Sequence, residues 1–147
     1  MDGTYILVVD DESRIRKLLR DFFTAKGYQI LEAEDGEKAI EVFEENRNKI
    51  KLILLDVMMP KLDGWSVLRQ IRQSSKVPII MLTAKGDDMD KILGLEYGAD
   101  DYITKPFSMP ILLRKIAAVL RRSKRGEDEK PQIITYGNLL LNCDSYA

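Results

Sequence analysis

The chain has 147 residues, of which 45% are hydrophobic and 32% are charged, and its formal net charge at pH 7 is -1. This balance is typical of one globular domain with room for part of a second, and it gives no bulk electrostatic reason to expect nucleic-acid or membrane binding. The sequence contains no histidine, which excludes a histidine-based triad, a histidine metal ligand and an internal phosphohistidine.

The cysteine content and the hydrophobic runs bear on the cellular compartment of the protein. Cys143 is the single cysteine, so no disulfide can form within the chain and a reducing environment is expected. No apolar run approaches the roughly 20 residues that cross a bilayer, and the first apolar run comes too early for a signal peptide. We therefore expect a cytoplasmic protein without a membrane partner.

Apolar runs alternate with segments that carry apolar side chains at helical spacing. The predicted strands are residues 6–9, 28–33, 51–55, 77–82 and 101–103. The predicted helices are residues 13–26, 37–46, 66–73, 87–97 and 111–122. Asp11 or Glu12 could cap the first of these helices or stabilise the positive end of its dipole.

The alternation predicts an α/β fold, a doubly wound (βα)5 with a parallel five-stranded sheet, right-handed crossovers and helices on both faces. The first, third and fourth strands are apolar throughout, so they should be central. In the flavodoxin-like strand order 2-1-3-4-5, a crevice lies between the carboxyl ends of the first and third strands. Asp10 and Asp11 follow the first strand and Asp56 follows the third, so the three carboxylates should flank this crevice.

Three neighbouring carboxylates repel one another, and such a cluster persists when a cation neutralises it. Oxygen ligands without histidine or thiolate favour Mg²⁺. A carboxylate beside Mg²⁺ is a competent nucleophile toward a phosphoryl group, which would make Asp56 an aspartyl phosphate. Thr83 and Lys105 end strands at the same edge and would contact the phosphoryl oxygens. Each residue taken singly is more often a cap, loop or surface residue, and the prediction depends on their shared edge.

The motifs VVDDE, LLDVMMPKLDGW, IIMLTAK and GADDYITKPF occur in this order. With them the chain resembles the response-regulator receiver domains of two-component systems over residues 5–122. The resemblance implies the flavodoxin-like fold and Asp56 as phosphoacceptor. It also implies a Mg²⁺ cofactor whose ligands are Asp10, Asp11, Asp56 and the backbone carbonyl of Met58.

The resemblance implies further roles around the acceptor. Thr83 and Lys105 would bind the phosphoryl group, and the peptide bond before Pro106 would be cis. Tyr102 would be the switch aromatic, which moves inward as Thr83 turns toward the phosphate. The alternative for Tyr102, an ordinary half-buried strand tyrosine, describes one of its two states.

The residue after Thr83 should line the mouth of the site. A small side chain at Ala84 leaves room for a phosphodonor and for attacking water. Met58 and Lys85 flank the same mouth and are expected to tune dephosphorylation, although Lys85 could equally be a plain surface charge.

The composition changes after Arg122. Residues 123–132 are charged, contain Gly and Pro and have no apolar side chain, which is typical of a linker. In residues 133–147, two apolar runs flank Gly137 and Asn138, a hairpin signal too short to be stable alone. We expect residues 1–122 to be the receiver domain and residues 133–147 to be the first strands of a truncated second domain.

The last motif, the final helix and this tail resemble the OmpR/PhoB-like transcription factors, which implies a winged-helix DNA-binding domain and promoter DNA as a partner of the full-length parent only. That subfamily also implies a homodimer through the fourth helix, fifth strand and fifth helix. Matching positions here are Lys91, Ile92, Leu95, Asp100, Asp101, Ile111, Leu113, Lys115 and Arg122. Ile111 replaces a usually acidic residue, so Lys91 loses its expected partner and the dimer should be more apolar. Alternatively, Ile111 or Leu113 packs on the sheet or faces solvent.

The predicted function is that of a non-enzymatic signalling domain, apart from its own phosphorylation and dephosphorylation. A sensor histidine kinase would donate the phosphoryl group to Asp56, and the modified domain would switch its dimerisation to control transcription.

Other classes of protein remain as alternatives. A stand-alone chemotaxis-type adaptor would lack the linker and hairpin. A phosphatase of the haloacid-dehalogenase type needs a second aspartate two residues after the nucleophile, where Met58 stands. A flavin mononucleotide binder would need a glycine-rich phosphate cradle after the first strand, and that loop is acidic.

Overall fold

The computed structural model describes residues 4–59, 61–84 and 98–129, and it has the predicted flavodoxin-like α/β fold. Its parallel strands form one sheet in the order β2-β1-β3-β4-β5. The strands are β1 (Tyr5–Val9), β2 (Gln29–Ala33), β3 (Ile50–Asp56), β4 (Ile79–Ala84) and β5 (Asp101–Lys105). The helices are α1 (Ser13–Ala25), α2 (Gly36–Glu45), α3 (Gly64–Arg72) and α5 (Met109–Glu129). The helix predicted at residues 87–97 lies outside the described residues.

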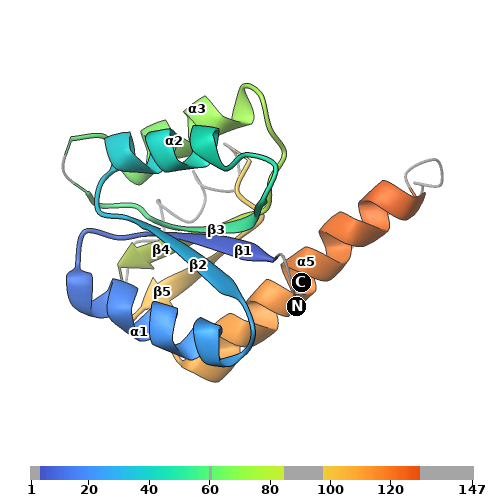
Figure 1. Cartoon of the computed structure of the whole chain (residues 1–147), viewed down its shortest axis with the longest axis horizontal. Coiled ribbons are helices and arrows are strands. Elements are labelled where there is room, and N and C mark those ends of the chain that lie inside the picture. Colours follow the sequence, from blue (N-terminus) through green and yellow to red (C-terminus); the bar gives the residue numbers. More distant parts are fainter. Residues whose placement is uncertain (1–3, 60, 85–97, 130–147) are drawn as a thin grey trace.

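Helices cover both faces of the sheet, with α2 and α3 on one face and α1 and α5 on the other (Figure 1). Central strands therefore bury side chains in both directions. In β1, Leu7 and Val9 join the core under α2 and α3, whereas Ile6 and Val8 join the core under α1 and α5. Burial of each such side chain contributes roughly 1.5–3 kcal/mol to folding. The prediction that the apolar first, third and fourth strands are central is confirmed.

The fourth strand begins two residues later than the apolar run suggested, at Ile79. Pro78 has no backbone N–H to donate, and the carbonyl of Val77 accepts a 2.8 Å hydrogen bond from the Arg72 guanidinium on α3. The Arg72 side chain thus binds the backbone of Val77, where a hydrogen bond to a neighbouring strand was expected.

The last helix continues past Arg122 to Glu129, and Figure 1 shows it extending away from the sheet. Residues 123–129, which the sequence assigned to a linker, are helical and continuous with α5. The predicted hairpin in residues 133–147 lies outside the described residues.

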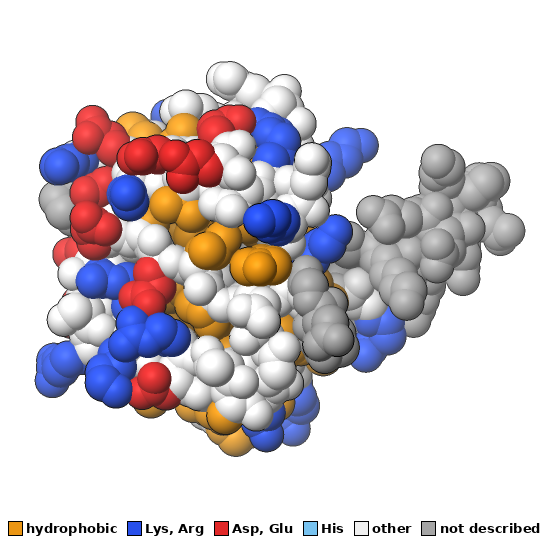
Figure 2. All heavy atoms as spheres, in the orientation of Figure 1, with side chains coloured by type: hydrophobic (Ala, Val, Ile, Leu, Met, Phe, Trp, Pro, Cys, Tyr) orange, Lys and Arg blue, Asp and Glu red, His pale blue; other side chains and the backbone are white. Residues whose placement is uncertain are grey.

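The surface carries mixed charge. Lys and Arg side chains are interspersed with Asp and Glu side chains on the face shown in Figure 2, in line with the near-zero net charge. Within the described ranges, no helix has the length and apolar character needed to cross a membrane.

Candidate functional site

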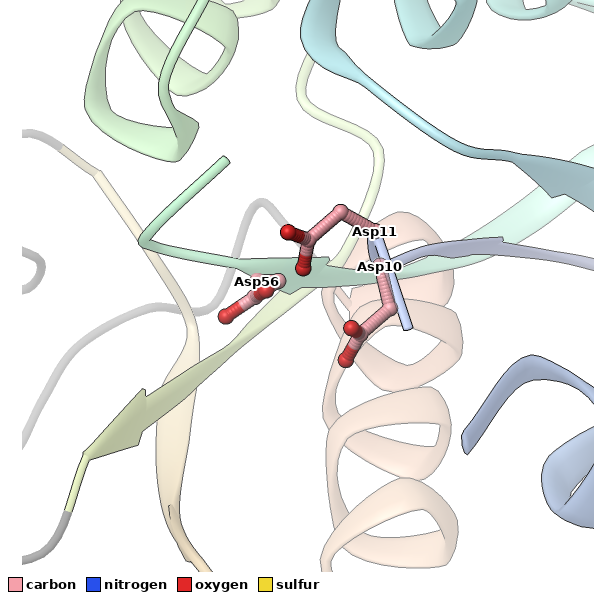
Figure 3. Close-up of side chains that lie close together, drawn as sticks. All are labelled: Asp10, Asp11 and Asp56. Atoms are coloured by element: carbon pink, nitrogen blue, oxygen red, sulfur yellow. The ribbon is translucent and has the colours of Figure 1, made fainter. Parts of the chain in front are cut away.

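The three predicted carboxylates meet at the carboxyl edge of the sheet. Asp56 is the last residue of β3, and Asp10 follows Val9, whose register partner in β3 is Leu55. One oxygen from each of Asp10, Asp11 and Asp56 lies within 4.8 Å of the others. Figure 3 shows the three side chains converging from the ends of these two strands. Asp10 and Asp56 are buried, and Asp11 is exposed.

The turn after Asp56 is closed tightly by a glycine. The N–H of Gly64 donates to the carbonyl of Val57 over 2.9 Å. A Cβ atom at Gly64 would lie 2.3 Å from the carbonyl oxygen of Asp56, closer than any side chain could be placed. Glycine at this position lets α3 start directly against the strand end that carries the central carboxylate.

Lys105 brings a cation to the cluster. It is the last residue of β5, and its Nζ lies 2.8 Å from Asp10 Oδ2 and 3.3 Å from Asp56 Oδ1. Its side chain is 20% exposed, so these contacts are largely shielded from water. The Lys105–Pro106 peptide bond is cis, as the resemblance implied.

The charges of the cluster do not balance. Burial, together with the negative charge of Asp10, raises the pKa of Asp56 to about 7, although Lys105 opposes the shift. Burial by itself lowers the pKa of Lys105, but its contacts with Asp10 and Asp56 outweigh burial and raise that pKa above its ordinary value. One ammonium group is therefore too little positive charge for three carboxylates.

Among the residues that the structure describes, two buried side-chain oxygens at this edge have no hydrogen-bond partner, Asp10 Oδ2 and Thr83 Oγ1. Asp10 Oδ2 lies 2.8 Å from the Lys105 ammonium as an ion pair. Buried polar atoms are normally hydrogen-bonded, so these oxygens are available to a ligand. An all-oxygen donor set with unsatisfied buried atoms and excess negative charge fits a hard cation such as Mg²⁺.

A surface pocket opens over the cluster. Its lining includes Asp11, Ile15, Asp56, Met58 and Lys105. Met58 is 68% exposed at this pocket, consistent with its expected place at the mouth. The side chain of Ala84, and the whole of Lys85, lie outside what the structure describes.

Sequence reasoning missed contributions from α1. Glu12 lies 3.9 Å from Lys105 Nζ, and the Arg16 guanidinium donates to the carbonyl of Asp10 over 2.7 Å. The signal available in the sequence was helical spacing, because residues 12 and 16 share the face of α1 nearest the β1 end.

The predicted switch tyrosine is partly buried. Tyr102 packs against the core under α2 and α3, and the Lys115 ammonium lies 5.7 Å from its ring centroid. The same ammonium is 3.3 Å from Asp101 Oδ1.

The other residues of the predicted dimer face differ in how far their side chains are exposed. Ile111 is 43% exposed, whereas Leu113 packs partly buried against the core under α1 and α5. Arg122 donates to the carbonyl of Asp100 over 3.3 Å. Lys91, Ile92 and Leu95 lie outside the described residues.

Comparison with known proteins agrees with this geometry. Residues 6–117 match the family model described as the response regulator receiver domain. The chain belongs to the response regulator receiver domain family. The chain is 52% identical over 138 residues to "Probable transcriptional regulator ycf27" of Cyanidium caldarium, covering 93% of this chain and 53% of that protein. It is 44% identical over 125 residues to "Transcriptional regulatory protein CpxR" of Escherichia coli, covering 85% of this chain and 53% of that protein.

Solved structures show the same fold. A response regulator receiver domain protein from Clostridium thermocellum superposes with a TM-score of 0.77 at 33% identity, covering 82% of this chain and 97% of that one. The BeF3-activated receiver domain of Klebsiella pneumoniae RstA gives a TM-score of 0.74 at 34% identity, covering 80% and 98%. Response regulators are signalling proteins, and this receiver domain spans about half the length of the curated relatives it matches.

Proposed function

We propose that this receiver domain accepts a phosphoryl group on Asp56 and thereby switches a signalling output. The observation that supports the proposal most strongly is the position of Lys105, whose ammonium contacts Asp56 Oδ1 at 3.3 Å while Asp10 and Asp11 converge on the same carboxylate. A buried carboxylate flanked by a fixed cation and by a cation-binding cluster is suited to receive a phosphoryl group.

Mg²⁺ is the proposed cofactor. Asp10, Asp11, Asp56 and the backbone carbonyl of Met58 would hold it, and the clustering of the three carboxylates within 4.8 Å supports this ligand set. When bound, the ion would neutralise the carboxylate charge and draw the oxygens of an incoming phosphoryl group toward Asp56.

The chemistry assigned to the protein is positioning and charge stabilisation. A carboxylate oxygen of Asp56 attacks the phosphorus of the donor, and the bond between phosphorus and the donor's leaving atom breaks with its electron pair going to the leaving group. Lys105 and the hydroxyl of Thr83 stabilise the negative charge on the transferred oxygens. Thr83 is 1% exposed with an unpartnered hydroxyl, which makes that hydroxyl free to bond a new acceptor.

The donor must come from outside the chain. Because the sequence contains no histidine, a sensor histidine kinase or a small acyl phosphate would supply the phosphoryl group. The absence of a membrane-crossing helix among the described residues and the lone cysteine support action in the cytoplasm.

The output would be a change in dimerisation that controls transcription. Thr83 turning toward the phosphate would let Tyr102 move further inward and alter the face formed by β5, α5 and residues 87–97. In the described structure, Lys115 forms an ion pair with Asp101 of the same chain. When two copies meet, this ion pair would either persist or be replaced by ion pairs between the two copies. The exposed Ile111 supports a more apolar contact.

The full-length parent would carry a DNA-binding domain. Support comes from the names of the relatives, both called transcriptional regulators, and from their length, because this chain covers 53% of each. Residues 1–122 are then the receiver domain, residues 123–132 the linker and residues 133–147 the first strands of a winged-helix domain.

Labelling by acetyl phosphate with Mg²⁺ tests the phosphoacceptor. We expect the unmodified chain to gain one phosphoryl group by intact mass spectrometry, and Asp56→Asn to gain none. Asp21→Asn, which changes an exposed aspartate on α1, is the matched control and should be labelled normally. Label retained on Asp56→Asn would overturn the assignment.

The rival functions have distinct readouts. Turnover of an added phosphomonoester would favour a phosphatase, although Met58 occupies the position where such enzymes need their second aspartate. A parent gene that ends shortly after residue 147 would favour a stand-alone adaptor.

A further inference from the structure

The turn between β1 and α1 carries Asp10 and Asp11, yet α1 lacks the side-chain cap found on its neighbours. Asp35 caps α2 by accepting from Lys38 N at 2.8 Å, and Asp63 caps α3 by accepting from Ser66 N at 2.9 Å. Glu12, the N-cap of α1, makes no such bond. The predicted capping of this helix by Asp11 or Glu12 is therefore wrong for Glu12, and the turn must be held in another way.

Arg16 reaches back across this turn from the first turns of α1. Its Nη1 donates to the carbonyl oxygen of Asp10 over 2.7 Å, and its Nε donates to Glu32 Oε1 on β2 over 3.3 Å. The Arg16 side chain is only 18% exposed. One guanidinium thus joins the end of β1, the start of α1 and the edge strand β2.

The contact matters because it completes the hydrogen bonds that hold the Asp10 backbone and one oxygen of its carboxylate. Its N–H donates to the carbonyl of Ala33 over 3.1 Å, and its Oδ1 accepts from the N–H of Glu12 over 2.9 Å. Asp10 is 0% exposed, so its carbonyl has no access to water and depends on a protein donor. Loss of the Arg16 donor would leave that carbonyl unsatisfied and release the peptide that leads into Asp11.

We propose that Arg16 is a positioning residue for the cation site, which holds the Asp10–Asp11 peptide so that both carboxylates face Asp56. This inference rests on the Mg²⁺ site proposed above. Groups that orient metal ligands change metal affinity by about 10–100-fold when they are removed. Arg16 acts through the backbone of Asp10 and need not touch the ion.

Arg20 provides a matched control one helical turn later. It is also an arginine on α1, and it also bonds Glu32, but its recorded partners among the described residues are Glu32 and Asp21. Substitution of either arginine by methionine removes the same charge and leaves an unbranched side chain of similar length.

The sign of the effect separates positioning from net charge. Removal of a positive charge near the cluster should by itself strengthen the binding of a cation. If Arg16 orients the ligands, Arg16→Met should instead weaken Mg²⁺ binding, whereas Arg20→Met should leave it unchanged or slightly tighter.

The test is isothermal titration calorimetry of the whole chain with Mg²⁺, at a temperature well below the unfolding transition of each variant. We expect the Kd to rise about tenfold in Arg16→Met and to stay within about twofold of the unmodified chain in Arg20→Met. In Arg16→Met, the amide of Glu12, which reports the orientation of the Asp10 carboxylate, should exchange faster with solvent.

The outcomes are distinguishable. An equal Kd for Arg16→Met and Arg20→Met would overturn the positioning role while the Mg²⁺ site stands. Failure of the unmodified chain to bind Mg²⁺ would overturn the site itself, and this inference with it.

Discussion

Two clusters of charged side chains lie at opposite ends of the sheet and differ in how their charges are matched. At the carboxyl edge, Asp10, Asp11 and Asp56 share the ammonium of Lys105. At the amino ends of β4 and β5, a carboxylate and a guanidinium face each other one to one, with Arg72 Nη2 3.0 Å from Asp100 Oδ2.

The Arg72 cluster is satisfied by the protein alone. Arg72 also donates to the carbonyls of Gly98 and Val77, each over 2.8 Å, and Asp100 Oδ2 accepts from Ile79 N over 2.8 Å. At the other end, by contrast, Asp10 Oδ2 and Thr83 Oγ1 lack hydrogen bonds.

Burial raises the pKa of both Asp56 and Asp100, but their neighbours differ in sign. The next largest influence on Asp56 is the negative charge of Asp10, which raises its pKa further. For Asp100, the Ile79 N–H and Arg72 oppose the shift. The comparison teaches that the charges of the Arg72 cluster are matched within the fold. The cluster around Asp56 has an excess of negative charge, which a bound cation can neutralise.

The largest effect is expected from a substitution that removes one carboxylate of the unbalanced cluster at the carboxyl edge of the sheet. Asp56→Asn should raise the free energy of unfolding by roughly 2–4 kcal/mol at pH 8 without divalent cations. In the unfolded chain this carboxyl loses its proton near its ordinary pKa of about 3.9, whereas the folded chain keeps the proton up to about pH 7. Between these values the folded state binds more protons, so the stability of the unmodified chain falls as pH rises.

The gain should therefore be absent at pH 4, grow through this window and be complete above pH 7. Urea unfolding at several pH values measures it. Asp21→Asn is the control, since Asp21 is exposed and its pKa is lowered by Lys17, so its loss should bring no gain. A gain for Asp56→Asn that is the same at pH 4 and pH 8 would contradict the account.

A smaller effect of opposite sign is expected in the balanced cluster. Arg72→Met should lower the free energy of unfolding by about 2 kcal/mol, because it strands Asp100 and leaves the carbonyls of Val77 and Gly98 without their donor. Thermal unfolding checks this, with the exposed Arg14→Met as the comparison. Equal stability of these two variants would show that the cluster contributes nothing.

Most of the fold could be predicted from the sequence. Short apolar runs such as residues 6–9 are typical of strands buried inside a parallel sheet, and their alternation with helical segments predicts the layers. The start of β4 was missed, because it depends on the Arg72 side chain bonding the carbonyl of Val77, which the apolar pattern of residues 77–82 does not indicate. The extension of α5 was also missed. The polarity of residues 123–129 was taken as the sign of a linker, although Lys124, Arg125 and Glu127 are good helix formers.

The meeting of the carboxylates with Lys105 at one edge of the sheet could be predicted, whereas the side chains that hold them in place could not. Asp10, Asp56 and Lys105 end strands at one edge, and strand topology alone brings them together. Helical spacing places Arg16 on the same face of α1 as Glu12, but spacing does not predict that the Arg16 side chain bonds the backbone carbonyl of Asp10. The missing hydrogen bonds of Thr83 depend likewise on packing in three dimensions.

The most direct test of the central claim is the titration of the Asp56 carboxyl carbon by nuclear magnetic resonance, with and without Mg²⁺. Without a divalent cation the account predicts a pKa of about 7. Saturation with Mg²⁺ should lower that pKa by at least about two units, because the ion supplies the positive charge that the cluster lacks. A pKa that is unchanged by Mg²⁺ would contradict the claim that this cluster is a cation site built around Asp56.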